Sequence, residues 1–291
     1  MELGGRTLSL ETGKVAKQAN GSVWIRYGDT IVLVTACRST RAGDRDFLPL
    51  TVEYREKAYA GGRIPGNFFK REGRMGEKET LSARLTDHLI RPMFPKEFRH
   101  EVQVFITVLS SDGENDADVL GMLGSGVSLC LSDIPFAAPI AAVRVARVDG
   151  DLIVNPTTSQ LEESDMDIIV GGTADSIGAV EGGAHEISEA ALLEALEFAH
   201  EHIKQLIELQ GDLIDAAGKE KMPFESSKPD PELVSAVSEI ASDRVGEANH
   251  TFDRDARQSL LDALRQDVLD SLAERFPDSE GAIDNIVNQL V

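Results

Sequence analysis

Short segments in the first third of the chain have patterns of apolar and polar residues that are typical of β-strands. Ser22 to Tyr27 alternates apolar and polar residues, and Thr30 to Ala36 is a β-branched run. Gly28-Asp29 separates the two segments and supplies turn chemistry, so together they predict a β-hairpin. Phe47 to Tyr54 and Val102 to Leu109 predict two further strands.

Helical periodicity first occurs over Glu77 to Arg91. Leu81, Leu85 and Leu89 recur at every fourth residue, and Pro92 follows the segment. This spacing places the three leucines on one face of a helix that ends at the proline.

Two more helices are predicted over Ala117 to Cys130 and Ser188 to Gln210. The first is rich in small residues, which allow close approach to a sheet at some cost in helix propensity. The second is strongly amphipathic, and its expected core residues are Leu192, Leu193, Leu196, Ile203 and Leu206. Strands are predicted between these helices over 141–148, 152–154 and 166–171.

The composition changes near Lys219. Lys221 to Pro231 contains three prolines and two serines in eleven residues, which is typical of a linker. Apolar residues at helical spacing follow as far as Val291. We therefore expect a core domain over residues 1–218, a linker over 219–231 and an all-helical domain over 232–291.

The 291 residues carry a formal net charge of −21, and 42% of them are hydrophobic. This apolar share suits a chain that buries a sizeable core. No apolar run has the length of a membrane span, and Met1 to Arg6 lacks the features of a secretory signal. We expect a cytoplasmic protein without a membrane partner. Cys37 and Cys130 lie far apart in the sequence and indicate neither a metal cluster nor a disulfide.

The net charge alone disfavours a nucleic-acid partner, because a chain this acidic should repel a polyanion. One segment of the sequence is basic, however. Residues 55–99 contain 11 Lys and Arg against 6 Asp and Glu, a local charge of +5. Within it, residues 58–76 are rich in glycine and predict a long functional loop. Phe68 and Phe69 offer faces on which bases stack, and the cations that follow can neutralise phosphates. These cations are Lys70, Arg71 and Arg74. The alternatives are a buried phenylalanine anchor and a solvated basic face.

Three long motifs carry a resemblance to a known family. They are the opening G-G-R-T-L-S-L-E-T-G-K-V-A-K-Q-A-N-G-S-V with G-D-T-I-V-L-V-T-A, the loop G-R-I-P-G-N-F-F-K-R-E-G-R, and the helix E-x-L-x-A-R-L-x-D-x-x-I-R-P-x-F-P. In this order they resemble the first core domain of bacterial polyribonucleotide nucleotidyltransferases (polynucleotide phosphorylases). The resemblance spans the whole chain, which therefore looks like an amino-terminal fragment of such an enzyme.

The resemblance implies an α+β fold with a ribonuclease PH-like core, built from ribosomal-protein-like β-α-β mixed sheets with helices, followed by a small all-α domain. It implies a phosphate-dependent 3′-to-5′ exoribonuclease that releases nucleoside diphosphates in mRNA degradation. Single-stranded RNA would be the substrate and inorganic phosphate the co-substrate, with Mg²⁺ as the metal, in a homotrimer formed through core domains. Degradosome-type partners, such as an endoribonuclease or an RNA helicase, are also implied.

The resemblance places catalysis in a second core that follows the helical domain and is absent from this chain. In that core a serine-rich stretch cradles phosphate, and a carboxylate pair with a lysine holds the metal. The corresponding positions here are Asp116 and Asp118, which would repel phosphate, and Leu161, Asp167 and Ile169, which keep only one acid. We expect no catalytic or metal-binding residue in this degenerate core. For Asp116 and Asp118 the alternative role is helix N-terminal capping.

By resemblance, the basic loop grips single-stranded RNA at the mouth of a central channel, and Arg84 and Arg91 point toward the neighbouring catalytic core. Arg84 could instead pair with a carboxylate of its own helix. Two functions stay open: the RNA-entry and trimer-contact part of the enzyme, or a non-catalytic RNA-binding and assembly module. A hydrolase that uses Asp165 and Asp167 is disfavoured, because positions two apart on a strand give no evident cleft.

Overall fold

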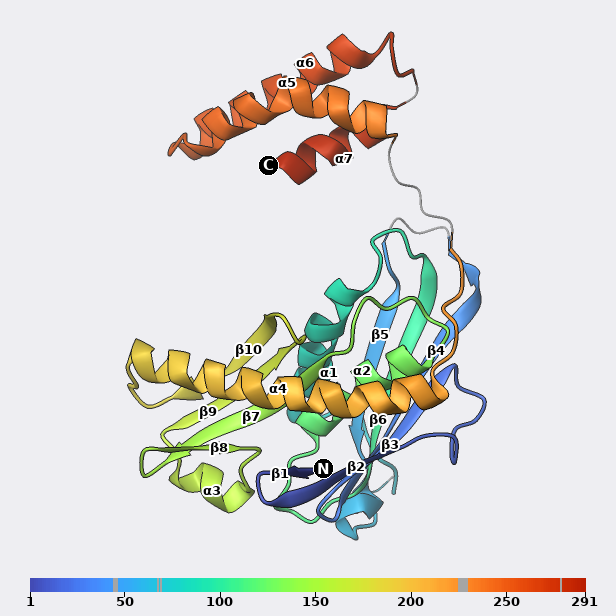
Figure 1. The fold of residues 1–291 in the computed structure, drawn as a ribbon, viewed down its shortest axis with the longest axis vertical. Coiled ribbons are helices and arrows are strands. Elements are labelled where there is room, and N and C mark those ends of the chain that lie inside the picture. Colours follow the sequence, from blue (N-terminus) through green and yellow to red (C-terminus); the bar gives the residue numbers. More distant parts are fainter. Residues whose placement is uncertain (44–46, 67, 69, 225–229, 278) are drawn as a thin grey trace. The chain divides into compact units, whose positions relative to one another are not determined.

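The chain groups into two units, Met1–Glu225 and Ser226–Val291 (Figure 1). Each unit is described by itself. The structure is a computed structural model that describes residues 1–43, 47–66, 68, 70–224, 230–277 and 279–291.

The first unit contains a six-stranded sheet with the order β1-β2-β3-β4-β6-β5. Neighbouring strands are antiparallel except β5 and β6, which are parallel. The predicted hairpin is confirmed: Tyr27 pairs with Thr30 across a turn in which Gly28 has a φ of +59°, a conformation that favours glycine. The strands are β1 Glu2–Leu3, β2 Arg6–Glu11, β3 Gly21–Tyr27, β4 Thr30–Ala42, β5 Leu50–Glu56 and β6 His100–Ser110.

The first unit also contains a four-stranded antiparallel sheet with the order β10-β9-β7-β8. Its strands are β7 Ala141–Val148, β8 Asp151–Val154, β9 Met166–Gly172 and β10 Ile177–Ala184. The helices of the unit are α1 Glu77–Ile90, α2 Asp118–Leu131, α3 Thr158–Glu163 and α4 Glu189–Ala217, with short 3₁₀ turns η1 Ala58–Gly61 and η2 Arg91–Met93. The expected α+β fold is confirmed.

Helix α2 joins the two sheets, because it packs against β3 and β4 of one sheet and β7 of the other. All its residues are buried. A Cβ atom added to Gly124 would lie 2.5 Å from Cγ2 of Val34, and one added to Gly126 would lie 2.6 Å from Cγ1 of Ile140. The prediction that small residues bring this helix close to a sheet is therefore confirmed.

Some elements differ from the sequence predictions. Strands β1, β2 and β10 and helix α3 have no counterpart among them. Strand β10 reads I-G-A-V-E-G-G-A and is exposed along nearly its whole length, so it carries no alternating pattern. The prediction that Leu193 belongs to the core is wrong, because its side chain is 61% exposed, whereas Ile203 and Leu206 are buried. Helix α4 also continues beyond Gln210.

The first residues of the predicted linker lie on the first unit instead of bridging to the next. The N–H of Lys219 donates to the carbonyl oxygen of Leu131 at 3.1 Å, and that of Met222 donates to the carbonyl oxygen of Asp133 at 2.8 Å. Nζ of Lys221 donates to three carbonyl oxygens at the end of α2, at 2.7 to 2.9 Å. Carbonyl oxygens at a helix C-terminus lack the backbone partners of the helix interior, so the lysine supplies donors to them. The link between the units therefore begins later than residue 219, and residues 225–229 lie outside the described part.

The second unit is helical, as predicted. Its helices are α5 Pro231–Asn249, α6 Arg254–Leu272 and α7 Glu280–Leu290, and they share one apolar core that includes Val237, Val268 and Val287. Asp253 caps α6 by accepting a hydrogen bond from the N–H of Ala256 at 2.8 Å. In the described part of the chain, no helix has both the length and the apolar character needed to cross a membrane.

We predict that Gly124→Ala destabilises the first unit. The added methyl group must displace Val34 and Ile25, and such overpacking costs about 1–3 kcal/mol, which outweighs the ~1 kcal/mol gained in helix propensity. Gly211→Ala on α4 is the matched control, because no atom lies within 4 Å of its added Cβ, and it should stabilise. Denaturant unfolding followed by the fluorescence of Trp24 measures both, and equal stability of the two variants would contradict the prediction.

Candidate nucleic-acid interface and adjoining carboxylate cluster

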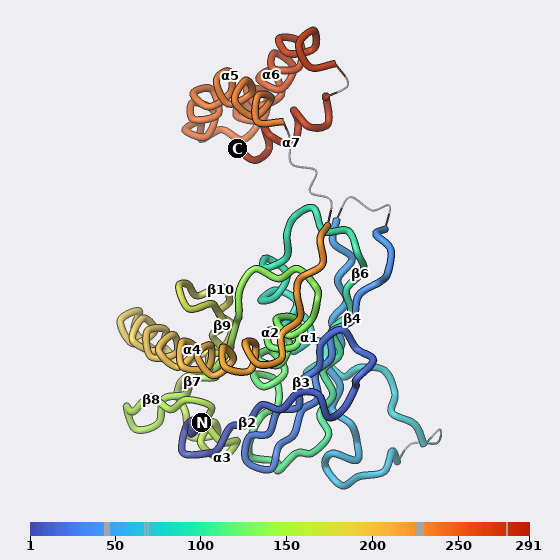
Figure 2. Tube along the Cα trace, turned by 45° about the vertical axis from the view of Figure 1, so that its right-hand side comes forward, coloured from blue at the N-terminus to red at the C-terminus, as the bar shows by residue number. Residues whose placement is uncertain are grey.

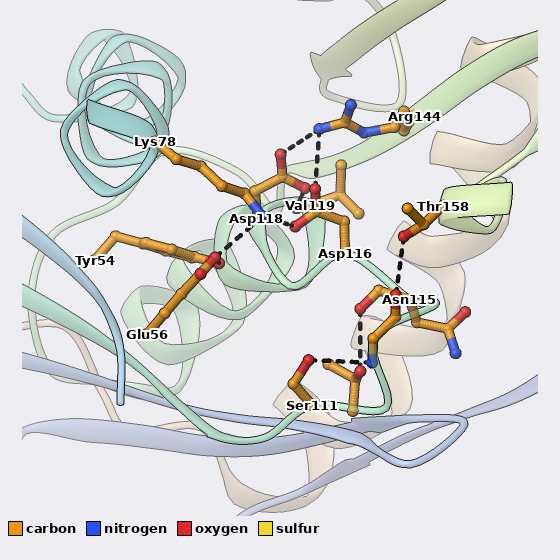
Figure 3. A network of polar contacts seen from close by, with 12 residues as sticks. Tyr54, Glu56, Lys78, Ser111, Asn115, Asp116, Asp118, Val119, Arg144 and Thr158 are labelled. Carbon is orange, nitrogen blue, oxygen red and sulfur yellow. Dashed lines mark hydrogen bonds and ion pairs between the residues drawn. The ribbon is translucent and has the colours of Figure 1, made fainter. Parts of the chain in front are cut away.

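Arg144 of β7 is nearly buried and contacts three carboxylates, of which Asp118 is buried and the other two are partly exposed (Figure 3). Its Nη2 donates to Oδ2 of Asp118 at 2.5 Å, at the start of α2. Its Nη1 donates to both oxygens of Asp167 on β9, at 2.9 and 2.8 Å. Asp116 lies 3.5 Å from Nη2 as a further ion pair. One guanidinium therefore ties α2 to two strands of the smaller sheet.

Lys78 of α1 connects this cluster to the larger sheet. Its Nζ lies 2.9 Å from Oδ1 of Asp116 and 3.2 Å from Oε1 of Glu56, at the end of β5. The hydroxyl of Tyr54 donates to the same Glu56 oxygen at 3.0 Å. Burial raises the pKa of Tyr54 far above its usual value, so this phenol stays a donor. We call these seven side chains the carboxylate cluster: Tyr54, Glu56, Lys78, Asp116, Asp118, Arg144 and Asp167.

Burial and neighbouring charges set the protonation of this cluster. Burial, reinforced by the nearby Asp116 carboxylate, raises the pKa of Asp118, although Arg144 opposes the rise. Burial alone would lower the pKa of Lys78, but the Asp116 and Glu56 carboxylates raise it. The cations therefore stay charged, and the acids are neutralised from within the protein.

The loop before α2 has already used the donors that a phosphate would need. Oδ1 of Asp112 accepts the N–H groups of Glu114 and Asn115 at 2.9 and 2.8 Å, and Oδ1 of Asp118 accepts the N–H of Val119 at 2.6 Å. Burial alone would raise the pKa of Asp112, but these and other hydrogen bonds lower it to about 2. Side-chain carboxylates thus accept two N–H groups of the loop before α2 and one in the first turn of the helix.

The degenerate positions behave in two ways. Asp116, Asp118 and Asp167 converge on Arg144, which the sequence reasoning missed. Leu161 lies on α3, and Ile169 of β9 lines a cavity of about 460 Å³ beside the cluster. The carboxylate oxygens that Mg²⁺ would need already bind Arg144 and Lys78, so these residues do not fit the metal. Among the described residues, no group of three or more His, Cys, Asp or Glu is arranged to hold one.

Asp165 is separate from this cluster. Its carboxylate binds Arg147 at 2.6 Å, whereas Asp167 binds Arg144. Each acid of the disfavoured hydrolase pair therefore has its own arginine. Arg144 was detectable in principle: it is the single charge in the apolar strand A-A-V-R-V-A, and a charge in a buried strand needs a partner.

The basic loop projects away from both sheets between β5 and α1 (Figure 2). Glu72 holds its base, because Oε2 binds Nζ of Lys57 at 2.9 Å and Oε1 accepts the N–H of Ala58 at 2.8 Å. Phe68 is 94% exposed, which excludes a buried anchor at this position, and Phe69 lies outside the described residues. The three cations are exposed: Lys70, Arg71 and Arg74.

A cleft of about 550 Å³ connects the loop with the carboxylate cluster. Lys57, Arg63 and Lys78 line it, together with Glu56 and Asp116. The sequence reasoning counted these cations in the basic segment but assigned them no role. The loop and the cluster are therefore parts of one surface.

Arg84 and Arg91 line one groove of about 420 Å³ between α1 and β5. Arg91 makes two hydrogen bonds to Asp87, at 2.9 and 2.7 Å, and reaches the carbonyl oxygens of Leu48 and Leu50 at 3.4 Å. Arg84 is exposed and has no hydrogen bond or ion pair with the described residues. The structure thus brings the two arginines together and leaves only Arg84 available.

Comparisons with known proteins agree with this architecture. Residues 4–135 match the 3′ exoribonuclease family, domain 1, and residues 138–202 match its domain 2. Polyribonucleotide nucleotidyltransferases of Heliobacterium modesticaldum and Bacillus cytotoxicus are 47% and 46% identical over all of this chain and over 41% of their own length. That of Thermomicrobium roseum is 49% identical over 92% of this chain and 34% of its own length. The chain spans about two fifths of the length of these relatives.

We predict that Arg144→Met lowers the free energy of unfolding by about 3–5 kcal/mol, because it leaves Asp118 buried without a counter-charge. Arg147→Met is the matched control, since its partner Asp165 is about half exposed whereas Asp118 is buried, and it should leave the unfolding midpoint nearly unchanged. Denaturant unfolding measures both. Similar midpoints for the two variants would show that Arg144 does not hold the cluster.

Proposed function

Because the chain belongs to the 3′ exoribonuclease family, we propose that it forms the RNA-entry part of a phosphate-dependent 3′-to-5′ exoribonuclease. The enzyme would be a polyribonucleotide nucleotidyltransferase that releases nucleoside diphosphates in mRNA degradation. The observation that carries this proposal is the basic loop, which presents an exposed phenylalanine beside three exposed cations.

The loop combines the two features that single-stranded RNA needs. Phe68 can stack on a base whatever its identity, and Lys70 and Arg74 can neutralise phosphates of the same strand. The hydrogen bonds of Glu72 to Lys57 and Ala58 hold the base of the loop in place. This limits the conformational entropy that the loop loses when RNA binds. Arg84 lies outside the loop and makes no hydrogen bond or ion pair with the described residues. It is therefore available to contact a neighbouring catalytic core.

The carboxylate cluster supports the proposal that chemistry takes place outside these residues. Attack of phosphate on the terminal phosphodiester needs donors for an anion and a carboxylate-bound Mg²⁺. Here Asp112 and Asp118 take the donors, and Arg144 and Lys78 take the carboxylates. We therefore assign phosphate and Mg²⁺ to a second core beyond this chain.

The same family membership supports the cellular setting that we propose for the longer protein. It would act in the cytoplasm as a homotrimer formed through its core domains. Degradosome-type partners, such as an endoribonuclease or an RNA helicase, would dock on that assembly. The second candidate function is a non-catalytic RNA-binding and assembly module. The carboxylate of Asp118 at the start of α2, paired with Arg144, favours this function for the chain taken alone.

We predict that Phe68→Ala with Phe69→Ala weakens binding of single-stranded poly(A) by about tenfold or more, since each stacked base contributes ~1–3 kcal/mol. Lys70→Gln with Arg74→Gln should reduce the slope of log affinity against log salt by about 1.4, because each phosphate contact contributes ~0.7. Arg254→Gln on the second unit is the control for charge. Fluorescence anisotropy measures all three, and an unchanged affinity of the phenylalanine variant would exclude the loop as the RNA site.

We predict that residues 1–291 do not release nucleoside diphosphates from poly(A) in the presence of phosphate and Mg²⁺. A full-length relative serves as the positive control. Chromatography of the products measures the release. Phosphate-dependent release by this chain would overturn the assignment of a degenerate core, whereas RNA binding without release would support it.

A further inference from the structure

Strand β10 forms an open edge of the smaller sheet (Figure 1). It pairs with β9 on one side, and no strand of the described residues pairs with its other side. All its residues are exposed except Ala179, which is partly buried. An open edge presents a row of N–H and C=O groups without partners, and such a row is a template for a further strand.

The β9–β10 ladder shows which backbone groups of β10 point outward. The N–H of His185 donates to the carbonyl oxygen of Asp165, its partner in the continued register, at 2.9 Å. Hydrogen-bonded and non-hydrogen-bonded positions alternate along an antiparallel pair. Counted back from His185, the outward positions are therefore Val180, Gly182 and Ala184. Among the described residues, the backbone groups at these positions make no hydrogen bond to another segment.

The edge lacks the features by which sheet edges commonly avoid pairing. Lysine and proline are frequent protections, and the strand I-G-A-V-E-G-G-A contains neither. Its irregularity lies near its start, between Ile177 and Ala179, so the residues that follow stay in register. Its one charged residue is Glu181. This carboxylate disfavours an acidic strand at the edge but not a basic one.

The surroundings of this edge are strongly acidic. Residues 148–203, which include β8, α3, β9, β10 and part of α4, contain 13 Asp and Glu and no Lys or Arg. Three cations of neighbouring elements are each paired with carboxylates: Lys78, Arg144 and Arg147. A second copy of the chain would bring an equally acidic segment to the edge, and RNA would be repelled by it. The occupant that fits this charge is a basic strand.

A cavity of about 460 Å³ beside β10 suits a long basic side chain. Its apolar part consists of Leu81, Leu85 and Ile169. Glu77 and Glu181 also line it, and neither makes a hydrogen bond or an ion pair with the described residues. The other charged residues that line it belong to the carboxylate cluster and are engaged there. A lysine or arginine can lay its apolar stem on the leucines and bring its charge to the two free carboxylates.

We propose that the β10 edge binds an extended basic segment of a partner protein, which adds a strand to the smaller sheet. The partner's backbone pairs with the outward groups of Val180, Gly182 and Ala184. Successive side chains of a strand alternate between the two faces of a sheet, so every second one lies on the face that holds the cavity. There Glu77 and Glu181 bind its charge. The proposal concerns a protein partner and is independent of the RNA site.

The first test uses a synthetic peptide with the required pattern. An eight-residue peptide of alternating lysine and valine, with blocked ends and a fluorescent label, should bind residues 1–291 in an anisotropy titration. The same peptide with N-methyl groups on its four central residues keeps its charge but cannot form a ladder. It should bind about tenfold or more weakly, because it loses several hydrogen bonds. A peptide with glutamate in place of lysine is the control for charge and should not bind.

The second test changes the edge of the chain itself. Val180→Pro removes one outward N–H and should raise the dissociation constant of the lysine–valine peptide by about tenfold or more, whereas Val180→Thr keeps that N–H and should change it by less than about twofold. Proline is tolerated at an edge position whose N–H has no partner, and denaturant unfolding checks that the variant folds.

Charge at the cavity is tested separately. Glu77→Gln with Glu181→Gln should raise the dissociation constant by roughly threefold to tenfold, because the two carboxylates no longer attract the basic side chain. Glu247→Gln on α5 is the matched control, since it removes an exposed carboxylate from the second unit, and it should have no effect.

Three results would overturn the proposal. The first is equal binding of the N-methylated and parent peptides, or unchanged binding by a folded Val180→Pro variant, since charge alone would then explain the attraction. The second is a parent peptide that does not bind at concentrations up to about 1 mM. The third is a dimer without peptide that Val180→Pro abolishes, because a second copy of the chain would then occupy the edge.

Discussion

The guanidinium of Arg144 is the interaction on which the first unit depends. It binds Asp118 at the start of α2 and Asp167 on β9, and through Asp116 it connects to Lys78 of α1. Both sheets and helices α1 and α2 are therefore connected through one network, which the larger sheet joins through Glu56 and Lys78. A buried arginine of this kind contributes little net stability relative to an apolar replacement, but losing one partner leaves the others without compensation. This all-or-none property fixes how α1, α2 and the smaller sheet are arranged.

The same network supports the proposal that this chain binds RNA while the chemistry takes place elsewhere. The carboxylates that line the start of α2 would repel phosphate, yet they are held by cations of the protein and make no demand for a metal. Outside residues 55–99 the chain carries −26, which keeps a polyanion away from most of the surface. The +5 segment differs from this acidic remainder, and it contains the loop that we propose as the RNA site. The acidity of the chain and the proposed RNA site are compatible because they lie in different parts of the sequence.

Local patterns predicted the elements whose burial is regular along the chain. The hairpin of β3 and β4 and the close packing of α2 both follow from residue type and spacing. β10 and α3 were missed because one is exposed on both faces and the other is a six-residue helix. Leu193 was assigned to the core because it lies among other apolar residues of α4. The prediction failed because the helix buries fewer residues than its apolar pattern suggests. The spacing of apolar and polar residues reflects which side chains are buried. It therefore does not predict an element that buries few side chains.

Long-range charge pairing was beyond sequence reasoning for a different reason. Asp118 and Asp167 are 49 residues apart, and both meet Arg144 only because α2, β7 and β9 converge. Viewed separately, the two aspartates indicated a capping residue and a remnant of a metal site. Their common arginine changes that interpretation, since a remnant would keep its oxygens accessible, whereas these oxygens are engaged. At these positions an internal ion network connects α2 with β7 and β9, which supports the proposal that this core has lost an anion and metal site.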